Sequence, residues 1–339
     1  MITQVLPASA AAIEQAALLL SGGAVVAFPT ETVYGLGANA LDEKAVLAIF
    51  AAKERPADNP LIAHIDDIAM LPLLTDSVSP RARALMDAFW PGPLTLILPR
   101  KPGIPDALSA GLPTIAVRMP AHPVARALIA ACGFPIAAPS ANRSGRPSPT
   151  TAAHVREDLA GRIPLIIDGG ACAVGVESTV VDMTGSAPAL LRPGGVTPGM
   201  LRALLPDLAI DRAVLSPLAP DAVAASPGMR HRHYAPRARV TVVRGEAEAV
   251  AAQICARYDA QPGALILCPS GHAGAYANRH VLPLGEDAAA MAAHLFDALR
   301  EADRLGASHV LAEAVDEAEM GLALMNRLLR AADFDIIEA

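Results

Sequence analysis

The sequence predicts an α/β protein of two domains, the first an open twisted sheet with flanking helices. Three observations lead to this prediction. The 339 residues exceed the usual size of one domain. Strand and helix patterns alternate through roughly the first 200 residues. A passage rich in proline and alanine then interrupts them. We therefore expect a domain at 1–205, a linker at 206–238 and a smaller α/β domain at 239–339.

The first domain is expected to open with a helix from Ser9 to Gly22-Gly23, because serine caps helices and glycine ends them. A strand follows at 25–29, and a second helix begins at Asp42. The connection at 184–187 resembles a hairpin turn, so the sheet is expected to be mixed and not purely parallel. The other expected strands are 60–65, 93–99, 114–120, 135–140, 164–168, 177–183 and 188–193.

The second domain begins with a strand at 240–243 and continues with a helix at 246–258. A strand at 264–269, a helix at 287–305 and a strand at 309–315 follow. This alternation is typical of a small parallel sheet, whose strands are joined by crossover helices.

Composition excludes several classes of protein. A formal net charge of −7 argues against a protein that coats nucleic acid with its whole surface. Positive charge is concentrated in one stretch, where Arg230, Arg232, Arg237 and Arg239 fall close together. No signal peptide or membrane span is expected from the sequence. Four cysteines without a CxxC pair fit a reducing cytoplasm better than a disulfide scaffold or zinc site.

Polar side chains interrupt several expected strands. In 114–120, alternation places Thr114 and Arg118 on one face with only an alanine between them. Ser140 and Asn142 would align in the same way if their segment stays extended, although both also suit the cap of a following turn. An unpaired buried polar group costs about 1–3 kcal/mol, so each needs a partner. For Arg118 that partner is a structural ion pair or a ligand carboxylate or phosphate.

Another polar segment follows the strand at 25–29. Glu31 and Thr32 precede two glycines, Gly35 and Gly37, which would permit the backbone to approach a ligand closely. The spacing matches neither a P-loop nor a GxGxxG motif.

Lys53 and Arg55 stand two residues apart at the end of an expected helix. Such a pair would bind a polyphosphate or compensate the helix dipole. His64 is a core histidine or a ligand-binding residue, and Ser178 and Arg192 are hairpin or site residues. No Ser-His-Asp order, paired catalytic carboxylates or HExxH motif is present. The candidate site residues therefore favour catalysis by positioning and charge neutralisation over covalent catalysis. Phosphoryl and nucleotidyl transfer are the reactions that need these two effects most.

Seven motifs, taken together and in order, resemble those of the threonylcarbamoyl-AMP synthase family. They include the Lys-x-Arg signature at Lys53 and Arg55 and the Ser-x-Asn signature at Ser140 and Asn142. The segment SPGMRHRHYAP at 226–236 resembles the long form of the family, which has two domains. The resemblance implies a YrdC-like first domain and a Rossmann-like second one. The motifs are FPTETVYGLG, KERPADNPLIAHI, WPGPLTLIL, TIAVRMPAHP, PSANRSGRPSPT, GVESTVVD and LLRPGG.

The resemblance also implies the reaction. Threonine takes up carbon dioxide from bicarbonate, and the carbamate attacks the α-phosphorus of ATP and expels pyrophosphate. Mg²⁺ would arrive with ATP, because no carboxylate pair is dedicated to it. A separate transferase complex would pass the product to tRNA in the cytoplasm, so neither tight tRNA binding nor a membrane is expected.

The site residues implied by the resemblance fall into three groups. The L-threonine pocket would comprise Thr32, His64, Arg118, the backbone at Ala138, and Ser178. The ATP side would comprise Lys53, Arg55, Asn59, Thr114, Ser140, Ser148, Arg192, His233 and Tyr234. Lys53, Arg55, Ser140 and Asn142 would carry catalysis. The linker would cover the active site as a lid, with its arginines facing phosphates.

Two other functions compete with this one. A module that binds double-stranded RNA or tRNA is the main alternative, although aromatic residues make up only 3% of the chain and RNP-like motifs are missing. A carbamoyl-phosphate-using enzyme of the hydrogenase maturation type is the other. Zinc-finger and acylphosphatase-like regions would accompany that activity, and the sequence does not lead us to expect them.

Overall fold

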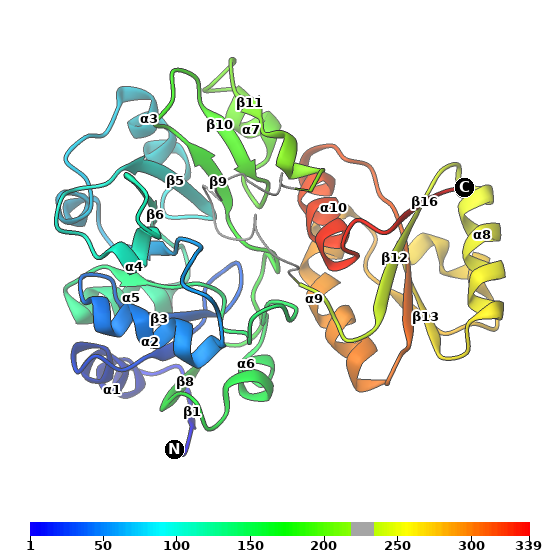
Figure 1. Ribbon diagram of the computed structural model, residues 1–339, viewed down its shortest axis with the longest axis horizontal. Helices are drawn as coiled ribbons and strands as arrows, with labels where there is room; N and C mark the ends of the chain where they lie inside the picture. The colour runs from blue at the N-terminus through cyan, green and yellow to red at the C-terminus, as the bar shows by residue number, and fades with distance from the viewer. Residues whose placement is uncertain (218–233) are drawn as a thin grey trace.

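The computed structural model describes residues 1–217 and 234–339, which form two sheets, each with its own helices (Figure 1). The first sheet has 11 strands in the order β1-β8-β2-β3-β7-β4-β6-β5-β9-β10-β11. They are β1 (Gln4–Pro7), β2 (Val26–Phe28), β3 (Gly35–Asn39), β4 (Ile62–His64), β5 (Leu94–Pro99), β6 (Thr114–Arg118), β7 (Ile136–Ala137), β8 (Leu165–Asp168), β9 (Thr179–Asp182), β10 (Ala189–Arg192) and β11 (Ala209–Ile210). It contains both parallel and antiparallel pairs, which confirms the expected mixed sheet.

The helices of the first domain start at the caps that the sequence provides. Ser9 and Asp42 cap the first two helices, as expected. Ser79, His122 and Thr151 cap three helices that the sequence analysis did not predict. The helices are α1 (Ala10–Ser21), α2 (Glu43–Lys53), α3 (Pro80–Phe89), α4 (Asp106–Ser109), α5 (Pro123–Cys132), α6 (Ala152–Leu159) and α7 (Pro198–Arg202), with short 3-10 turns at Ile68–Leu73 and Arg212–Val214.

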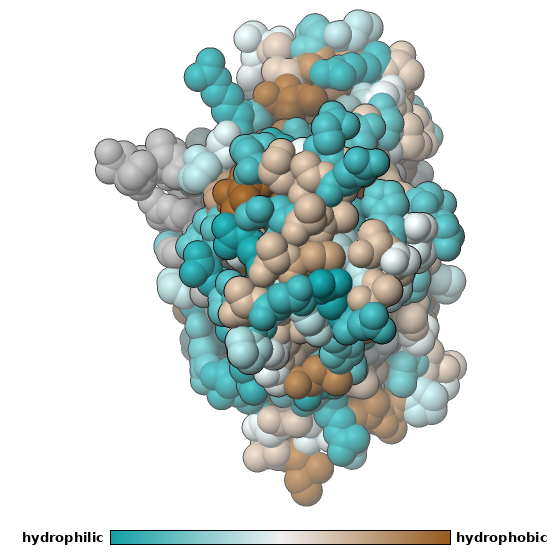
Figure 2. Space-filling model, turned by 90° about the vertical axis from the view of Figure 1, so that its right-hand side faces the viewer, coloured by the Kyte–Doolittle hydropathy of each residue, from teal (hydrophilic) through white to brown (hydrophobic). Residues whose placement is uncertain are grey.

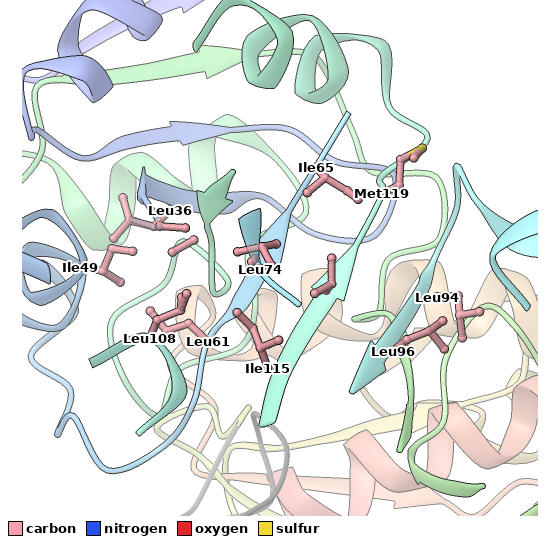
Figure 3. Packing of buried hydrophobic residues seen from close by; sticks show 14 of the residues in the cluster. Leu36, Ile49, Leu61, Ile65, Leu74, Leu94, Leu96, Leu108, Ile115 and Met119 are labelled. Atoms are coloured by element: carbon pink, nitrogen blue, oxygen red, sulfur yellow. The ribbon is translucent and has the colours of Figure 1, made fainter. Parts of the chain in front are cut away.

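Hydrophobic clusters cover both faces of the first sheet. On one face, buried side chains such as Leu36, Ile49, Leu61, Leu108 and Ile115 gather from the sheet and from helices α2 and α4 (Figure 3). On the other face, α1 and α5 pack against β2, β7 and β8. With both faces covered, the polar site must lie where strands end or loops leave the sheet.

The second sheet has the order β14-β13-β15-β12-β16, and every pair in it is parallel. Its strands are β12 (Arg239–Arg244), β13 (Ala264–Cys268), β14 (Val281–Pro283), β15 (His309–Glu313) and β16 (Ile336–Glu338), and its helices are α8 (Ala247–Ala260), α9 (Ala288–Arg304) and α10 (Glu319–Ala331), with a 3-10 turn at Ser270–Tyr276. The expected small parallel sheet is confirmed, and α10 and β16 are additions to the expected elements.

Helices α9 and α10 lie between the second sheet and the first domain (Figure 1). Their cluster includes Val33 and Val176 of the first domain, so the two domains share a hydrophobic contact. On the side of the molecule that carries α8, hydrophilic and weakly hydrophobic residues are mixed across the surface (Figure 2). Among the described residues, no helix has both the length and the apolar character to cross a membrane.

Candidate active site

One pocket collects most of the residues that the sequence singled out. It lies where the loop after β2, strands β4 and β6, the loop after β7 and the start of β9 come together with β10. Of the predicted site residues, nine line it: Thr32, Arg55, His64, Arg118, Ala138, Ser140, Ser178, Arg192 and Tyr234. They come from segments more than 200 residues apart, so the fold assembles one site from motifs that are scattered in the chain.

Arg118 ends β6 and lies buried at one side of the pocket. Its guanidinium donates to the Thr32 hydroxyl at 2.8 Å and to the Gly92 carbonyl at 3.2 Å, and it pairs with Glu31 at 2.6 Å. Burial of Glu31 disfavours its charged form, but the Arg118 charge and the hydrogen bonds from Arg118 and the Ala121 backbone together hold the Glu31 pKa below its usual value. Arg118 therefore has the structural ion pair that the sequence analysis considered, and it also lines the pocket, while ligand binding by Arg118 stays a prediction.

His64 is the register partner of Arg118 on the neighbouring strand β4. Its Nδ1 lies 3.2 Å from the Ile62 carbonyl, which can only accept, so Nδ1 carries the proton of the neutral ring. Burial, and then the Arg118 charge, lower its pKa to about 3. His64 is thus a neutral hydrogen-bonding residue of the pocket and a poor general base near neutral pH.

Arg55 and Arg192 bring positive charge to the pocket. Arg55 donates to the Asn59 carbonyl at 3.2 Å. The central carbon of its guanidinium lies 5.7 Å from the centroid of the Phe50 ring. Arg192 donates to the carbonyl and hydroxyl oxygens of Ser178 at 3.0 and 3.1 Å. Burial lowers the pKa of both guanidinium groups to about 10, so both stay protonated at neutral pH. Two fixed cations in one pocket have the charge that suits an anion such as a phosphate group.

Lys53 occupies a different place from the one its spacing suggested. Its ammonium is buried and donates to the carbonyl oxygens of Ser140 at 2.5 Å and Asn142 at 2.6 Å, and to the Asn142 side chain at 3.3 Å. Burial, and then the Arg55 charge, hold its pKa well below the usual value. Lys53 does not line the pocket; it anchors the loop that presents Ser140 to it.

The Ser-x-Asn signature combines the two alternatives that the sequence left open, because Ser140 bridges Gly35 in an antiparallel pair and the chain bends at Asn142. Strand β7 ends at Ala137, and Pro139 cannot donate a hydrogen bond to continue the ladder. The Ser140 hydroxyl donates to the Asn142 side chain at 2.5 Å. The Asn142 amide then donates to the carbonyl oxygens of Arg143 and Arg146, both at 2.8 Å. The segment therefore stays extended as far as Ser140, and Asn142 stabilises the loop that follows.

Three other predicted residues do not line the pocket, and a fourth lies outside the described residues. Asn59 is buried, and neither atom of its amide has a hydrogen-bond partner within the described part of the chain. Thr114 begins β6 and is partly exposed. Ser148 donates to the carboxylate of Glu177. His233 lies outside the described residues.

Glu177 is the main pocket residue that the sequence analysis missed. It precedes β9 and is buried, although a glutamate beside a strand would ordinarily be exposed. Burial raises its pKa, but the charges of Arg327 and Arg192 outweigh burial and hold it below the usual value. Thr30 and Gly35, which lie in the polar segment after the strand at 25–29, also line the pocket, and the other unpredicted lining residues are Val33, Ile62 and Pro139.

Gly35 and Gly37 are needed for packing within the sheet. A Cβ on Gly35 would lie 3.2 Å from the Ala138 Cβ, and one on Gly37 would lie 2.8 Å from the Phe28 ring. Of the two, only Gly35 also lines the pocket. The expected close backbone approach is present, but it is mainly to Phe28 and the β7 segment and not to a ligand.

Tyr234 brings the end of the linker into the pocket. Its φ of +64° places it in the left-handed region, and its ring lies 5.2 Å from that of Phe296 on α9. Its neighbour Ala235 donates to the Gly145 carbonyl at 2.9 Å. Arg239, by contrast, pairs with Asp335 of the second domain at 2.9 Å, so it does not face the pocket as we expected.

Two family models match consecutive parts of the chain. A family model described as "Telomere recombination" matches residues 18–194, and one described as "Threonylcarbamoyl-AMP synthase, C-terminal domain" matches residues 196–333. Threonylcarbamoyl-AMP synthases of Pyrococcus abyssi and Bacillus subtilis are 48% and 47% identical to the chain. The alignments cover 95% and 96% of this chain and 94% of each relative.

A solved structure gives the same result for the fold. The crystal structure of P. abyssi Sua5 complexed with L-threonine has a TM-score of 0.94 and 45% identity, and all of both chains is covered. The resemblance noted from the motifs is thus confirmed over the whole length. The chain belongs to the threonylcarbamoyl-AMP synthase family, in the form that has two domains.

Proposed function

We propose that this chain synthesises L-threonylcarbamoyl-AMP from L-threonine, bicarbonate and ATP and releases pyrophosphate. The observation that carries the proposal is one pocket with two different ends. Arg118, Thr32 and His64 lie together at one end, and Arg55 and Arg192 bring charge suited to phosphates. Such a pocket suits the joining of a small amino acid to a nucleotide.

The threonine end is proposed from the chemistry of its side chains. The guanidinium of Arg118 suits the substrate carboxylate, because charge-assisted hydrogen bonds to carboxylates are strong and directional. Thr32, Ser178 and neutral His64 provide groups for the hydroxyl and amine. The related Sua5 protein, whose fold this chain shares, was crystallised with L-threonine.

The reaction balances as two bond-forming steps. The threonine nitrogen attacks carbon dioxide derived from bicarbonate and loses a proton, which gives a carbamate. A carbamate oxygen then attacks the α-phosphorus, and the bond to the β-phosphate breaks to release pyrophosphate. Arg55 and Arg192 would neutralise phosphate charge, and the fixed positions of both substrates would lower the entropic cost. Ser140 would contact the nucleotide from the loop that Lys53 anchors.

Mg²⁺ is proposed to enter with ATP. Among residues 1–217 and 234–339, no group of three His, Cys, Asp or Glu side chains is placed to hold a metal ion. The carboxylate that lines the pocket, Glu177, is already paired with Arg327. Phosphate oxygens and water would therefore supply most ligands, and the ion would reduce the charge of the triphosphate.

The remaining proposals concern the product. Tyr234, together with His233 before it, would cover the nucleotide and exclude water from a labile mixed anhydride. The product would pass, in the cytoplasm, to a separate complex that modifies tRNA, so this chain would not hold tRNA tightly.

Pyrophosphate release by the purified protein tests the proposed function. The assay contains ATP and Mg²⁺, and threonine and bicarbonate are each omitted in turn. We expect release only when both are present. Release without either, or no release under any combination, would refute the proposal. RNA binding with a steep salt dependence and no need for ATP would then favour the RNA-binding alternative.

A further inference from the structure

Arg327 of the second domain reaches the border of the pocket. It lies in the middle of α10 and is fully buried. Its Nε donates to the Glu177 carboxylate at 2.7 Å, and its two terminal nitrogens donate to the Pro193 carbonyl at 3.0 Å and the Glu177 carbonyl at 3.2 Å. One side chain of the second domain thus holds two segments of the first, just before β9 and just after β10.

Those segments carry residues of the nucleotide end. The Glu177 carboxylate accepts from Ser148 through one oxygen and from Arg327 through the other. Ser178, next to Glu177, accepts two hydrogen bonds from Arg192. The position of Glu177 therefore fixes Ser148 directly and Arg192 through the backbone.

Arg327 also contacts the linker. The centre of its guanidinium lies 5.8 Å from the centroid of the Tyr234 ring. The same ring also packs against Phe296 of α9. A guanidinium at this distance from an aromatic face is attracted to it. Arg327 is thus shared between Glu177, a carboxylate of the pocket, and Tyr234, the aromatic residue that the linker places there.

We propose that Arg327 is a positioning residue of the active site, through which the second domain orders the nucleotide end of the pocket. This inference rests on the proposed function, because it assumes that ATP occupies that end. Arg327 acts through Glu177 and Tyr234 and touches no substrate itself. Three residues of the threonine end, Thr32, His64 and Arg118, lie on the loop after β2, on β4 and on β6, and among the described residues Arg327 donates to none of them. Of the threonine end, Ser178 alone follows a residue that Arg327 binds.

The test separates positioning from stability. We would compare the full-length wild type with R327M and with the double variant E177Q/R327M, measuring ATP and threonine binding separately by calorimetry and thermal unfolding in parallel. The double variant leaves no unpaired carboxylate at Glu177, so it should unfold at a higher temperature than R327M. We expect both variants to bind ATP at least about tenfold more weakly, and threonine less than threefold more weakly.

Arg304 provides the matched control. It lies on α9 and contacts His154 of the first domain at 3.1 Å, but it is partly exposed and does not line the pocket. R304M should bind both substrates as the wild type does. If E177Q/R327M folds and binds ATP like the wild type, Arg327 is merely structural and the inference is overturned. A wild type that binds no ATP would instead refute the proposed function.

Discussion

Arg118 and His64 show how one buried site alters two basic side chains differently. They face each other in register on β6 and β4. The guanidinium keeps its charge because Glu31 and the Thr32 hydroxyl stabilise it. The imidazole loses its charge because burial and the neighbouring cation both disfavour the protonated form. The site therefore presents a fixed cation beside a neutral hydrogen-bonding ring.

A substitution at Arg118 tests this arrangement. R118K keeps the charge, but one ammonium cannot reach Glu31, Thr32 and Gly92 and also bind a substrate carboxylate. Loss of a charge-assisted hydrogen bond costs about 1.5–3 kcal/mol, so we expect the KM for threonine to rise about 10–100-fold. The KM for ATP should change much less. Both constants follow from pyrophosphate release.

Arg81 supplies the control for R118K. It pairs with Asp207 at the surface, and its side chain is 42% exposed. R81K should leave both KM values unchanged. Equal rises in the two KM values of R118K would contradict a role at the threonine end.

At the scale of elements, the loop after β7 depends on a lysine that lies 87 residues earlier in the chain. Helix α2 ends at Lys53, which reaches the Ser140 and Asn142 carbonyls. K53M would leave both carbonyls without this donor, and we expect a loss of about 3 kcal/mol in the free energy of unfolding. Denaturation in urea measures it, and K44M on the exposed face of α2 is the matched control.

ATP binding distinguishes this role of Lys53 from direct phosphate contact. If Lys53 acts only by anchoring the loop, the loss of stability in K53M should accompany the loss of ATP affinity. A variant with full stability and no ATP binding would instead place its ammonium on the phosphates. That outcome would contradict the anchoring role.

The sequence predicted most of the regular elements, although it missed the 13-residue helix α10, and it failed where tertiary contacts decide. Helices α1 and α2 were predicted because a capping residue, Ser9 or Asp42, stands directly before a periodic apolar pattern in each case. Helices α3, α5 and α6 also have caps, but they are short and were missed. Most of the pocket was found from its motifs. Glu177 was missed because its partner, Arg327, is 150 residues away in the other domain.

At the scale of the whole molecule, two buried arginines join the domains. Arg327 binds Glu177, and Arg300 of α9 pairs with Asp158 at 2.8 Å and donates to the Pro147 carbonyl at 2.5 Å. Burying a charge is costly unless it is paired and hydrogen-bonded, and both arginines satisfy that condition. The interface is therefore sensitive to the loss of a single partner.

Arg300 gives the prediction for the interface. R300M removes one partner of a buried ion pair, and we expect it to lower the free energy of unfolding by about 3–5 kcal/mol. D158N/R300M should recover part of that loss, because the buried carboxylate is then removed, although Asp158 also binds Arg146 and the more exposed Glu157 still loses Arg300. R279M, which breaks an exposed pair with Asp259 inside the second domain, should cause no resolvable change.

Unfolding in urea, followed by tryptophan fluorescence and circular dichroism, measures the stability of all three variants. The single Trp90 reports on the first domain alone, so R300M should separate the two signals if Arg300 couples the domains. Coincident signals with unchanged stability would mean that the hydrophobic contact of α9 and α10 holds the domains together without it.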